Sequence, residues 1–132
     1  MVQAYMAGPV MEPADNGRSW REQLKDEYEE LEWVDPLDKY SSDDDRYLSP
    51  EAIVTQDKYW IDKSDVLFVG WKRQPSVGTP MEMMYSFDRE IPVIVWLREG
   101  EVESSSPWLR YHADSIHTRK REAVQMAMFA NK

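Results

Sequence analysis

Two continuous apolar runs, at 66–69 and 91–97, constrain the fold of this chain more than any other feature. Each run is too short to cross a membrane, and both faces of an extended chain would be apolar there. Such strands suit a parallel sheet that helices cover on both sides. The segment 19–31 predicts one of those helices, because apolar residues recur in it at a spacing of three to four. Alternating strands and helices therefore predict an α/β protein with a parallel sheet.

The remaining elements are placed by turn and capping residues. Ser49 and Pro50 predict the start of a helix that runs to about residue 63, and Thr79 with Pro80 predicts another that reaches about residue 89. The charged segment 38–49 is predicted to be a surface loop. Further strands are expected at 2–7, at 33–34 and within 108–116, and a last helix is expected at 118–130.

Composition limits the classes of function. The 132 residues suit a single domain with one core. A net charge of −9 argues against binding a nucleic acid polymer, which needs a basic patch, but backbone amides can still hold a small anion. With no cysteine and only two histidines, neither a metal nor a cofactor is expected. No signal peptide or membrane span is visible, so we expect a cytoplasmic protein that does not contact a membrane.

Any site should lie beyond the carboxyl ends of the parallel strands. Three loops are predicted to reach that edge, at 7–11, 71–79 and 98–106. Asp57 is a further candidate, because helical spacing puts it on the same face as Ile53 and Ile61, which should meet the sheet. A carboxylate in that position is costly to bury unless it is paired or functional. The alternative is a solvated residue at the edge of the apolar stripe.

The stretch Ser76-Val77-Gly78-Thr79-Pro80-Met81-Glu82 allows two interpretations. It follows a buried strand and opens a helix, so its amides suit an anion, and the helix dipole would keep a Glu82 carboxylate ionised for nucleophilic attack. The structural interpretation is a capping box, with Thr79 as N-cap and Glu82 three residues later. Two other residues are also candidates for the site. Tyr5 suits a ligand contact or the core, and Ser106 suits turn chemistry.

Three motifs resemble those of the nucleoside 2-deoxyribosyltransferase superfamily, over most of the chain. Tyr5-Met6-Ala7-Gly8-Pro9 is similar to that family's opening Y-x-A-G-P. The stretch from Asp57 to Asp65 is similar to its D-x-x-x-I-x-x-[SA]-D, and the stretch from Gly78 to Glu82 to its G-T-x-x-E. Each motif alone is weak, but all three in this order are fairly specific. The resemblance implies a flavodoxin/Rossmann-like three-layer sandwich with a parallel five-stranded sheet, with residues 1–132 as one nucleoside 2-deoxyribosyltransferase-like domain.

The resemblance also implies an enzyme that attacks the N-glycosidic bond of a small nucleoside or nucleotide. Glu82 would attack the anomeric carbon and form a glycosyl-enzyme intermediate. Asp57 would serve as the acid or proton relay for the departing base, and Tyr5 would orient Glu82. These roles agree with retaining glycosyl cleavage, in which one carboxylate is the nucleophile and another group handles protons. The family further implies a homodimer or a higher homo-oligomer.

Within that family, the chain resembles the 2′-deoxynucleoside 5′-monophosphate N-hydrolase branch. Ser76 stands six residues before Glu82, where transferases of free nucleosides usually carry Asp and these hydrolases carry a Ser that contacts phosphate. A hydroxyl can donate to a phosphate, whereas a carboxylate would repel it. Ser106 begins a segment that resembles the one reaching the neighbouring subunit's site, where a Ser binds phosphate. Gly8 and Gly78 complete the expected binding set.

The chain departs from this branch after its first glycine. Pro9, Val10 and Met11 stand where the hydrolases tend to carry Ser and Arg, which add phosphate contacts. Arg18 is the candidate that would replace the lost positive charge, although its spacing differs. The resemblance therefore supports a 5′-phosphate on the evidence of Ser76 and leaves a free nucleoside open.

Several alternatives remain open. One is a nucleoside 2-deoxyribosyltransferase that exchanges bases, and another is a non-catalytic nucleotide-binding or sensing protein in which Glu82 only caps a helix. A third is an NAD-cleaving domain of similar topology. The sequence identifies neither the base nor the choice between ribose and 2-deoxyribose. Three tryptophans are as consistent with the core as with stacking on a base: Trp20, Trp60 and Trp71.

Overall fold

The computed structural model describes residues 1–10, 17–39, 49–72, 76–100 and 106–130. Five parallel strands form one sheet in the order β2-β1-β3-β4-β5. The strands are β1 (Gln3–Ala7), β2 (Glu32–Val34), β3 (Val66–Trp71), β4 (Val93–Leu97) and β5 (Ser115–His117). The predicted α/β fold with a five-stranded parallel sheet is thus confirmed.

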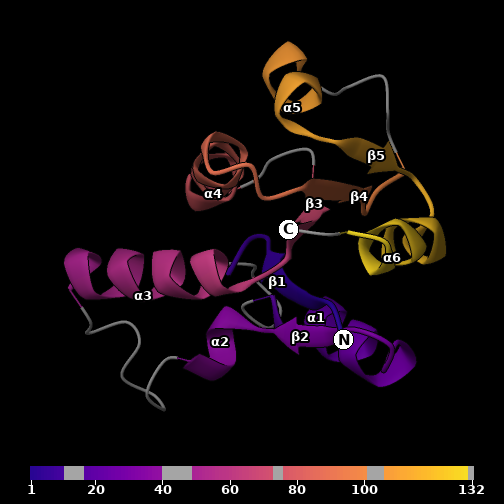
Figure 1. The fold of residues 1–132 in the computed structure, drawn as a ribbon, viewed down its shortest axis with the longest axis horizontal. Coiled ribbons are helices and arrows are strands. Elements are labelled where there is room, and N and C mark those ends of the chain that lie inside the picture. Colours follow the sequence, from indigo (N-terminus) through magenta and orange to yellow (C-terminus); the bar gives the residue numbers. More distant parts are fainter. Residues whose placement is uncertain (11–16, 40–48, 73–75, 101–105, 131–132) are drawn as a thin grey trace.

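Helices cover both faces of this sheet, as Figure 1 shows. The helices are α1 (Arg18–Glu27), α2 (Pro36–Lys39), α3 (Pro50–Lys63), α4 (Gly78–Asp88), α5 (Pro107–His112) and α6 (Lys120–Met128). The start of α3 is confirmed, since the Ser49 hydroxyl accepts a hydrogen bond from the Ala52 amide and Pro50 is the first helical residue. Residues 40–48 of the predicted surface loop lie outside the described residues, as does Met11.

Three predicted elements differ from the structure. The first two residues of the predicted loop 38–49 are helical, because they end α2. The segment expected to hold a strand, 108–116, begins as α5, and only its last two residues belong to β5. Ser106 caps this helix by accepting a hydrogen bond from the Leu109 amide at 3.1 Å, with Pro107 at the first helical position. Helix α1 ends at Glu27 rather than near residue 31, although Leu31 is still buried in the core.

Alternating side chains of the central strands build two hydrophobic clusters, one on each face. Tyr5 and Leu67 point toward the face covered by α3 and α4, whereas Met6 and Phe68 point toward the face covered by α1 and α6. The strand order reverses between β1 and β3, because β2 lies on one side of β1 and β3 to β5 lie on the other. Open α/β sheets bind their ligands at such a switch point. No described helix is long and apolar enough to cross a membrane.

Trp20 of α1 packs where β1 and β3 end, and it needs glycine at two positions. A Cβ at Gly8 would lie 2.5 Å from Cζ2 of the indole, and a Cβ at Gly70 would lie 2.7 Å from its Cη2. Both distances are shorter than real contacts. Gly8 therefore has a packing reason for being glycine, in addition to its place at the candidate site.

Candidate active site

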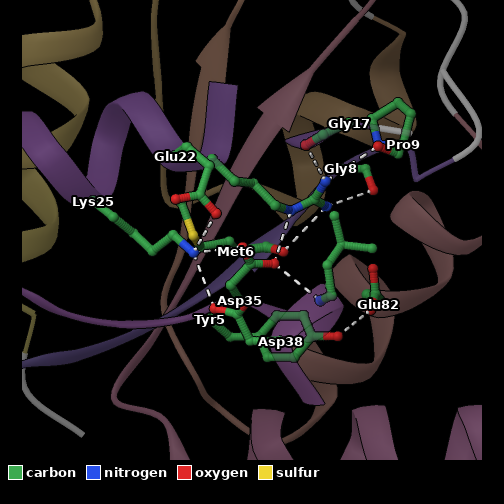
Figure 2. A network of polar contacts seen from close by, with 12 residues as sticks. Tyr5, Met6, Gly8, Pro9, Gly17, Glu22, Lys25, Asp35, Asp38 and Glu82 are labelled. Carbon is green, nitrogen blue, oxygen red and sulfur yellow. Dashed lines mark hydrogen bonds and ion pairs between the residues drawn. The ribbon is translucent and has the colours of Figure 1, made fainter. Parts of the chain in front are cut away.

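Tyr5 and Glu82 meet at the carboxyl end of the central strands. Tyr5 lies in β1 and is fully buried, and its hydroxyl donates a hydrogen bond to Oε2 of Glu82 at 2.9 Å (Figure 2). Glu82 lies in the second turn of α4, the helix that follows the neighbouring strand β3. The two residues are 77 positions apart in the sequence, so the sheet topology alone brings them together.

Burial, which is the largest cause, and the nearby charge of Asp57 together raise the pKa of Glu82 from its ordinary value of 4.5 to about 8. The hydrogen bond from Tyr5 and the positive charge of Arg21 act in the opposite direction but do not compensate. The side chain is only partly accessible, through a cavity, so its carboxyl is surrounded by protein. The prediction that the helix dipole keeps Glu82 ionised is therefore wrong at neutral pH, because burial outweighs the dipole.

The cavity has a volume of about 710 Å³ and extends between α3 and α4. Helix α3 contributes Ile53, Asp57 and Ile61, the residues that were predicted to share one face. That face borders the cavity as well as the core, and Asp57 is half-buried. Such a mostly apolar cleft with a few convergent polar groups is typical of a small-molecule site. The structure thus brings Asp57 and Glu82 to the same cavity.

The N-terminus of α4 opens into this cavity, and it is not the predicted capping box. Val77 is the N-cap residue and makes no side-chain cap, while Thr79 lies inside the helix and is buried. The Ser76 and Thr79 hydroxyls lie 2.9 Å apart. Because the helix begins two residues earlier than predicted, Glu82 does not cap it. Ser76 and Gly78 line the cavity, and no atom would contact a Cβ at Gly78 within 4 Å.

Arg21 holds the chain that follows β1 in place over the site. Its guanidinium is fully buried and donates hydrogen bonds to the carbonyl oxygens of Gly8 and Gly17, each at 2.9 Å. It also donates to the carbonyl oxygens of Met6 and Pro9, at 3.4 and 3.3 Å. Its Nε lies 3.7 Å from Oδ1 of Asp35. A buried cation of α1 therefore positions the backbone of this loop.

Arg18, the sequence candidate for the lost positive charge, is exposed on α1 and does not line the cavity. Arg21, three residues further along, is the cavity-lining arginine of this helix. Sequence reasoning missed it, although a usable pattern was present. Arg21 shares the helical stripe of Leu24 and Tyr28, and a buried arginine in an apolar stripe needs partners.

Among the described residues, one group of carboxylates has the spacing of a possible metal site: Glu22, Asp35 and Asp38. The ammonium of Lys25 lies between 2.9 and 3.0 Å from an oxygen of each of these side chains. The Lys25 ammonium therefore balances part of the negative charge of this acidic group, and Figure 2 shows Lys25 among the three carboxylates. None of these three carboxylates lines the Glu82 cavity, although Arg21, which pairs with Asp35, does.

The far end of the cavity holds a polar cluster that the sequence did not indicate. Tyr85 of α4 donates a hydrogen bond to Oδ2 of Asp62 at 2.9 Å, and Nε of Arg89 lies 3.3 Å from Oδ1 of the same carboxylate. Partial burial, followed by the bond to Asp62, raises the pKa of Tyr85, so its phenol stays protonated at neutral pH. Lys58 of α3 completes this end of the cavity.

Ser106 lies at a different cavity of the same chain. That cavity has a volume of about 280 Å³ and lies between α4 and α5. Its lining includes Trp71, Trp108 and His112. Met81 and Met84 line both cavities and form the ridge between them. Within one chain, the structure therefore does not bring Ser106 to Glu82. Trp20 and Trp60 do not line the Glu82 cavity either, and both pack against the core.

Comparison with solved structures finds the same fold in several proteins. A conserved protein from Enterococcus faecalis V583 has a TM-score of 0.75 at 15% identity, over 96% of this chain and 97% of the other. A 2-deoxyribosyltransferase from Bacillus psychrosaccharolyticus has 0.74 at 18% identity, over 91% and 88%. The CMP N-glycosidase BcmB from Clostridium botulinum has 0.58 at 17% identity, over 94% and 95%. No family model and no curated protein sequence matches the chain. The fold implied by the sequence motifs is confirmed.

Proposed function

We propose that this protein is an N-glycosidase that hydrolyses the base–sugar bond of a (2′-deoxy)nucleoside 5′-monophosphate through a glycosyl-enzyme intermediate on Glu82. The observation that carries the proposal is the meeting of Tyr5, Asp57 and Glu82 in one cavity at the switch point of the sheet. The names of two solved structures with this fold, a 2-deoxyribosyltransferase and a CMP N-glycosidase, agree with this chemistry.

In the proposed reaction, an oxygen of the Glu82 carboxylate bonds to the anomeric carbon as the carbon–nitrogen bond breaks. The electron pair of that bond leaves with the base, and Asp57 supplies the proton that the base needs. Water then attacks the same carbon, Asp57 takes up a proton from it, and Glu82 is released as a carboxylate. The raised pKa of Glu82 means that one proton stays in this pair of carboxyls at neutral pH, and attack requires it to reside on Asp57.

The N-terminus of α4 is the proposed site for the 5′-phosphate. The free amides of the first helical turn and the Ser76 hydroxyl are donors that suit a phosphate, and Gly78 leaves room for it. Arg18 does not line this cavity, and Arg21 is already bonded to backbone carbonyls, so neither adds a free cation here. The proposed phosphate contact therefore rests on hydroxyl and backbone donors.

A base-release screen tests the proposal directly. Ribo- and deoxyribonucleoside 5′-monophosphates and the corresponding free nucleosides are incubated with the protein, and the free base is quantified by chromatography. Release of base from a monophosphate supports the hydrolase. If no nucleoside or nucleotide releases its base, the enzymatic function is wrong, and the non-catalytic binding protein becomes the better description.

A second candidate is a nucleoside 2-deoxyribosyltransferase, which the likeness to the Bacillus psychrosaccharolyticus and Leishmania mexicana deoxyribosyltransferase structures favours. The same intermediate serves both reactions, and the acceptor decides between them. Adding a second free base to each assay separates the two. Exchange of bases without net accumulation of free sugar would contradict the hydrolase and support the transferase.

The pH profile provides a further prediction. The value of kcat/KM is expected to fall as the pH rises through about 8, because the pair of carboxyls then loses the proton that the departing base requires. Tyr5→Phe removes a hydrogen bond that favours the ionised Glu82, so this falling limb should move to higher pH. Tyr59→Phe, at an exposed position on α3, is the matched control. A rate that instead increases through pH 8 would show that ionisation of Glu82 alone limits the reaction.

A second copy of the chain is the proposed partner. An apolar surface on α4 and α5 includes Met81, Trp108 and Tyr111, which are 67, 71 and 70% exposed, and Ser106 lies beside it. Such a patch is typical of an interface. A dimer through this surface would allow Ser106 to reach the neighbouring subunit's phosphate site, as the sequence resemblance implies.

Mixing two variants tests whether the site is shared. Ser106→Ala is expected to raise KM for the monophosphate by about tenfold, the value of one hydrogen bond to a charged group. Glu82→Gln should be inactive by itself. When the two are unfolded and refolded together, mixed dimers contain one intact site, so activity toward low substrate concentrations should exceed the mean of the separate samples. Activity equal to that mean would show that Ser106 does not act across an interface.

A further inference from the structure

The far end of the Glu82 cavity presents hydrogen-bond donors with few partners of their own. Nζ of Lys58 lies 5.1 Å from the centre of the Tyr85 ring, and Cζ of Arg89 lies 3.5 Å from it. Both positions are in the range of cation–π contacts. The three side chains line the cavity together: Lys58 belongs to α3, Tyr85 belongs to α4, and Arg89 is the C-cap residue of α4.

Lys58 and Arg89 both keep N–H groups that make no hydrogen bond in the described part of the chain. Lys58 makes no hydrogen bond or ion pair within the described part of the chain. The ion pair between Arg89 and Asp62 uses Nε, and the terminal nitrogens of Arg89 make no hydrogen bond among the described residues. The Tyr85 hydroxyl already donates to Asp62. Asp88 also lines this end, but it is exposed to water. A ligand that reaches this end therefore meets N–H donors that lack acceptors.

The positions of Tyr85 and Arg89 along α4 and at its end relate this part of the cavity to the proposed reaction. At about 1.5 Å per residue, Gly78 lies about 6 Å before Glu82, and Arg89 lies about 10 Å after it. Tyr85 is about 4.5 Å beyond Glu82. With the phosphate at the N-terminus of α4 and the anomeric carbon at Glu82, the base extends toward Tyr85, and its far edge faces Lys58 and Arg89.

We propose that Lys58 and Arg89 determine base specificity, by donating hydrogen bonds to a carbonyl oxygen on the edge of the base that is remote from the sugar. The cavity then favours 6-oxopurines and 4-oxopyrimidines over the corresponding 6-amino and 4-amino bases. An amino group in that position would place its hydrogens against the N–H donors and leave both sides unpaired. The proposal rests on the proposed N-glycosidase function, and it identifies the class of substrate.

Two pairs of substrates that differ at one position test this proposal. The value of kcat/KM for base release is compared between dIMP and dAMP, and between dUMP and dCMP. The oxo member of each pair should be preferred by at least about tenfold, which is the usual discrimination of a good Lys or Arg contact to a base carbonyl. Lys58→Met and Arg89→Met should each reduce this ratio toward one, mainly by raising KM for the oxo substrate.

Lys63→Met provides the matched control, because Lys63 is also an exposed lysine of α3 placed over a tyrosine ring, at 5.5 Å from Tyr59, and does not line the cavity. Its ratio should equal that of the wild type. If base is released but the wild type prefers the amino members, or if both methionine variants keep the wild-type ratio, the specificity proposal is wrong and the N-glycosidase function stands. If no substrate releases its base, the function fails, and the specificity proposal fails with it.

Discussion

Glu82→Gln is expected to lower base release by at least about a thousandfold, while the protein keeps its fold and its ability to bind the nucleotide. An amide has nearly the shape of the carboxyl and can still accept the hydrogen bond from Tyr5, but it cannot attack the anomeric carbon. The measurement is single-turnover base release. A titration with the nucleoside 5′-monophosphate then measures whether the variant still binds the nucleotide.

The matched control is Glu90→Gln, an exposed glutamate just beyond α4 that does not line the cavity. This variant should retain the wild-type rate. Two results would count against the assigned role: Glu82→Gln with more than a few per cent of the wild-type rate, or equal losses in both variants. A wild type that binds nucleotide without ever releasing base would instead favour the sensing protein, in which Glu82 is not a nucleophile.

Arg21→Met is expected to destabilise the protein by about 3–5 kcal/mol, as is usual when one partner of a buried charged network is removed. The substitution removes the donor to four backbone carbonyls and leaves the buried Asp35 with Lys25 as its remaining cation. Urea unfolding followed by tryptophan fluorescence measures the free energy of unfolding. Base release should fall as well, because Gly8, whose carbonyl oxygen Arg21 holds, lines the cavity.

Arg18→Met is the comparison that makes this test specific. Arg18 belongs to the same helix and carries the same charge, but it is exposed, so its substitution should change the free energy of unfolding by no more than about 0.5 kcal/mol. Similar losses in the two variants would show that net charge, and not the buried hydrogen bonds of Arg21, accounts for the effect. Loss of nucleotide binding in Arg18→Met alone would restore the sequence-based role of Arg18.

The centre of the sheet was predictable because β3 and β4 are apolar at nearly every position. The runs at 66–69 and 91–97 become β3 and β4, which are buried on both faces, as such patterns predict. The short helix α5 was missed for a local reason. The side chains of this segment favour a strand, namely Trp108, Leu109 and Tyr111. Ser106 and Pro107 are instead typical of a helix start, and the structure shows the helix that they cap.

The site was predictable as a set of residues but not as a chemical environment. Sequence motifs pointed to Tyr5, Asp57 and Glu82, and the structure brings Asp57 and Glu82 to one cavity, with Tyr5 bonded to Glu82. The local pattern around Thr79 nevertheless suggested a capping box, and the dipole suggested an ionised Glu82. Both expectations failed because the start of a helix and the burial of a carboxyl depend on packing between α3 and α4, which no local spacing encodes.

The raised pKa of Glu82 also has a consequence for how this protein would evolve under laboratory selection. The folded state retains a proton on Glu82 between pH 4.5 and about 8, whereas the unfolded chain has released it, so this group makes the fold less stable as the pH rises through that window. Glutamine at position 82 would avoid this penalty. Selection for thermal tolerance alone at alkaline pH should therefore enrich that substitution, and selection for base release should remove it. Sequencing both populations would measure the frequency of glutamine at position 82. A higher frequency after selection for stability than after selection for base release would show that stability and catalysis favour different side chains at this position.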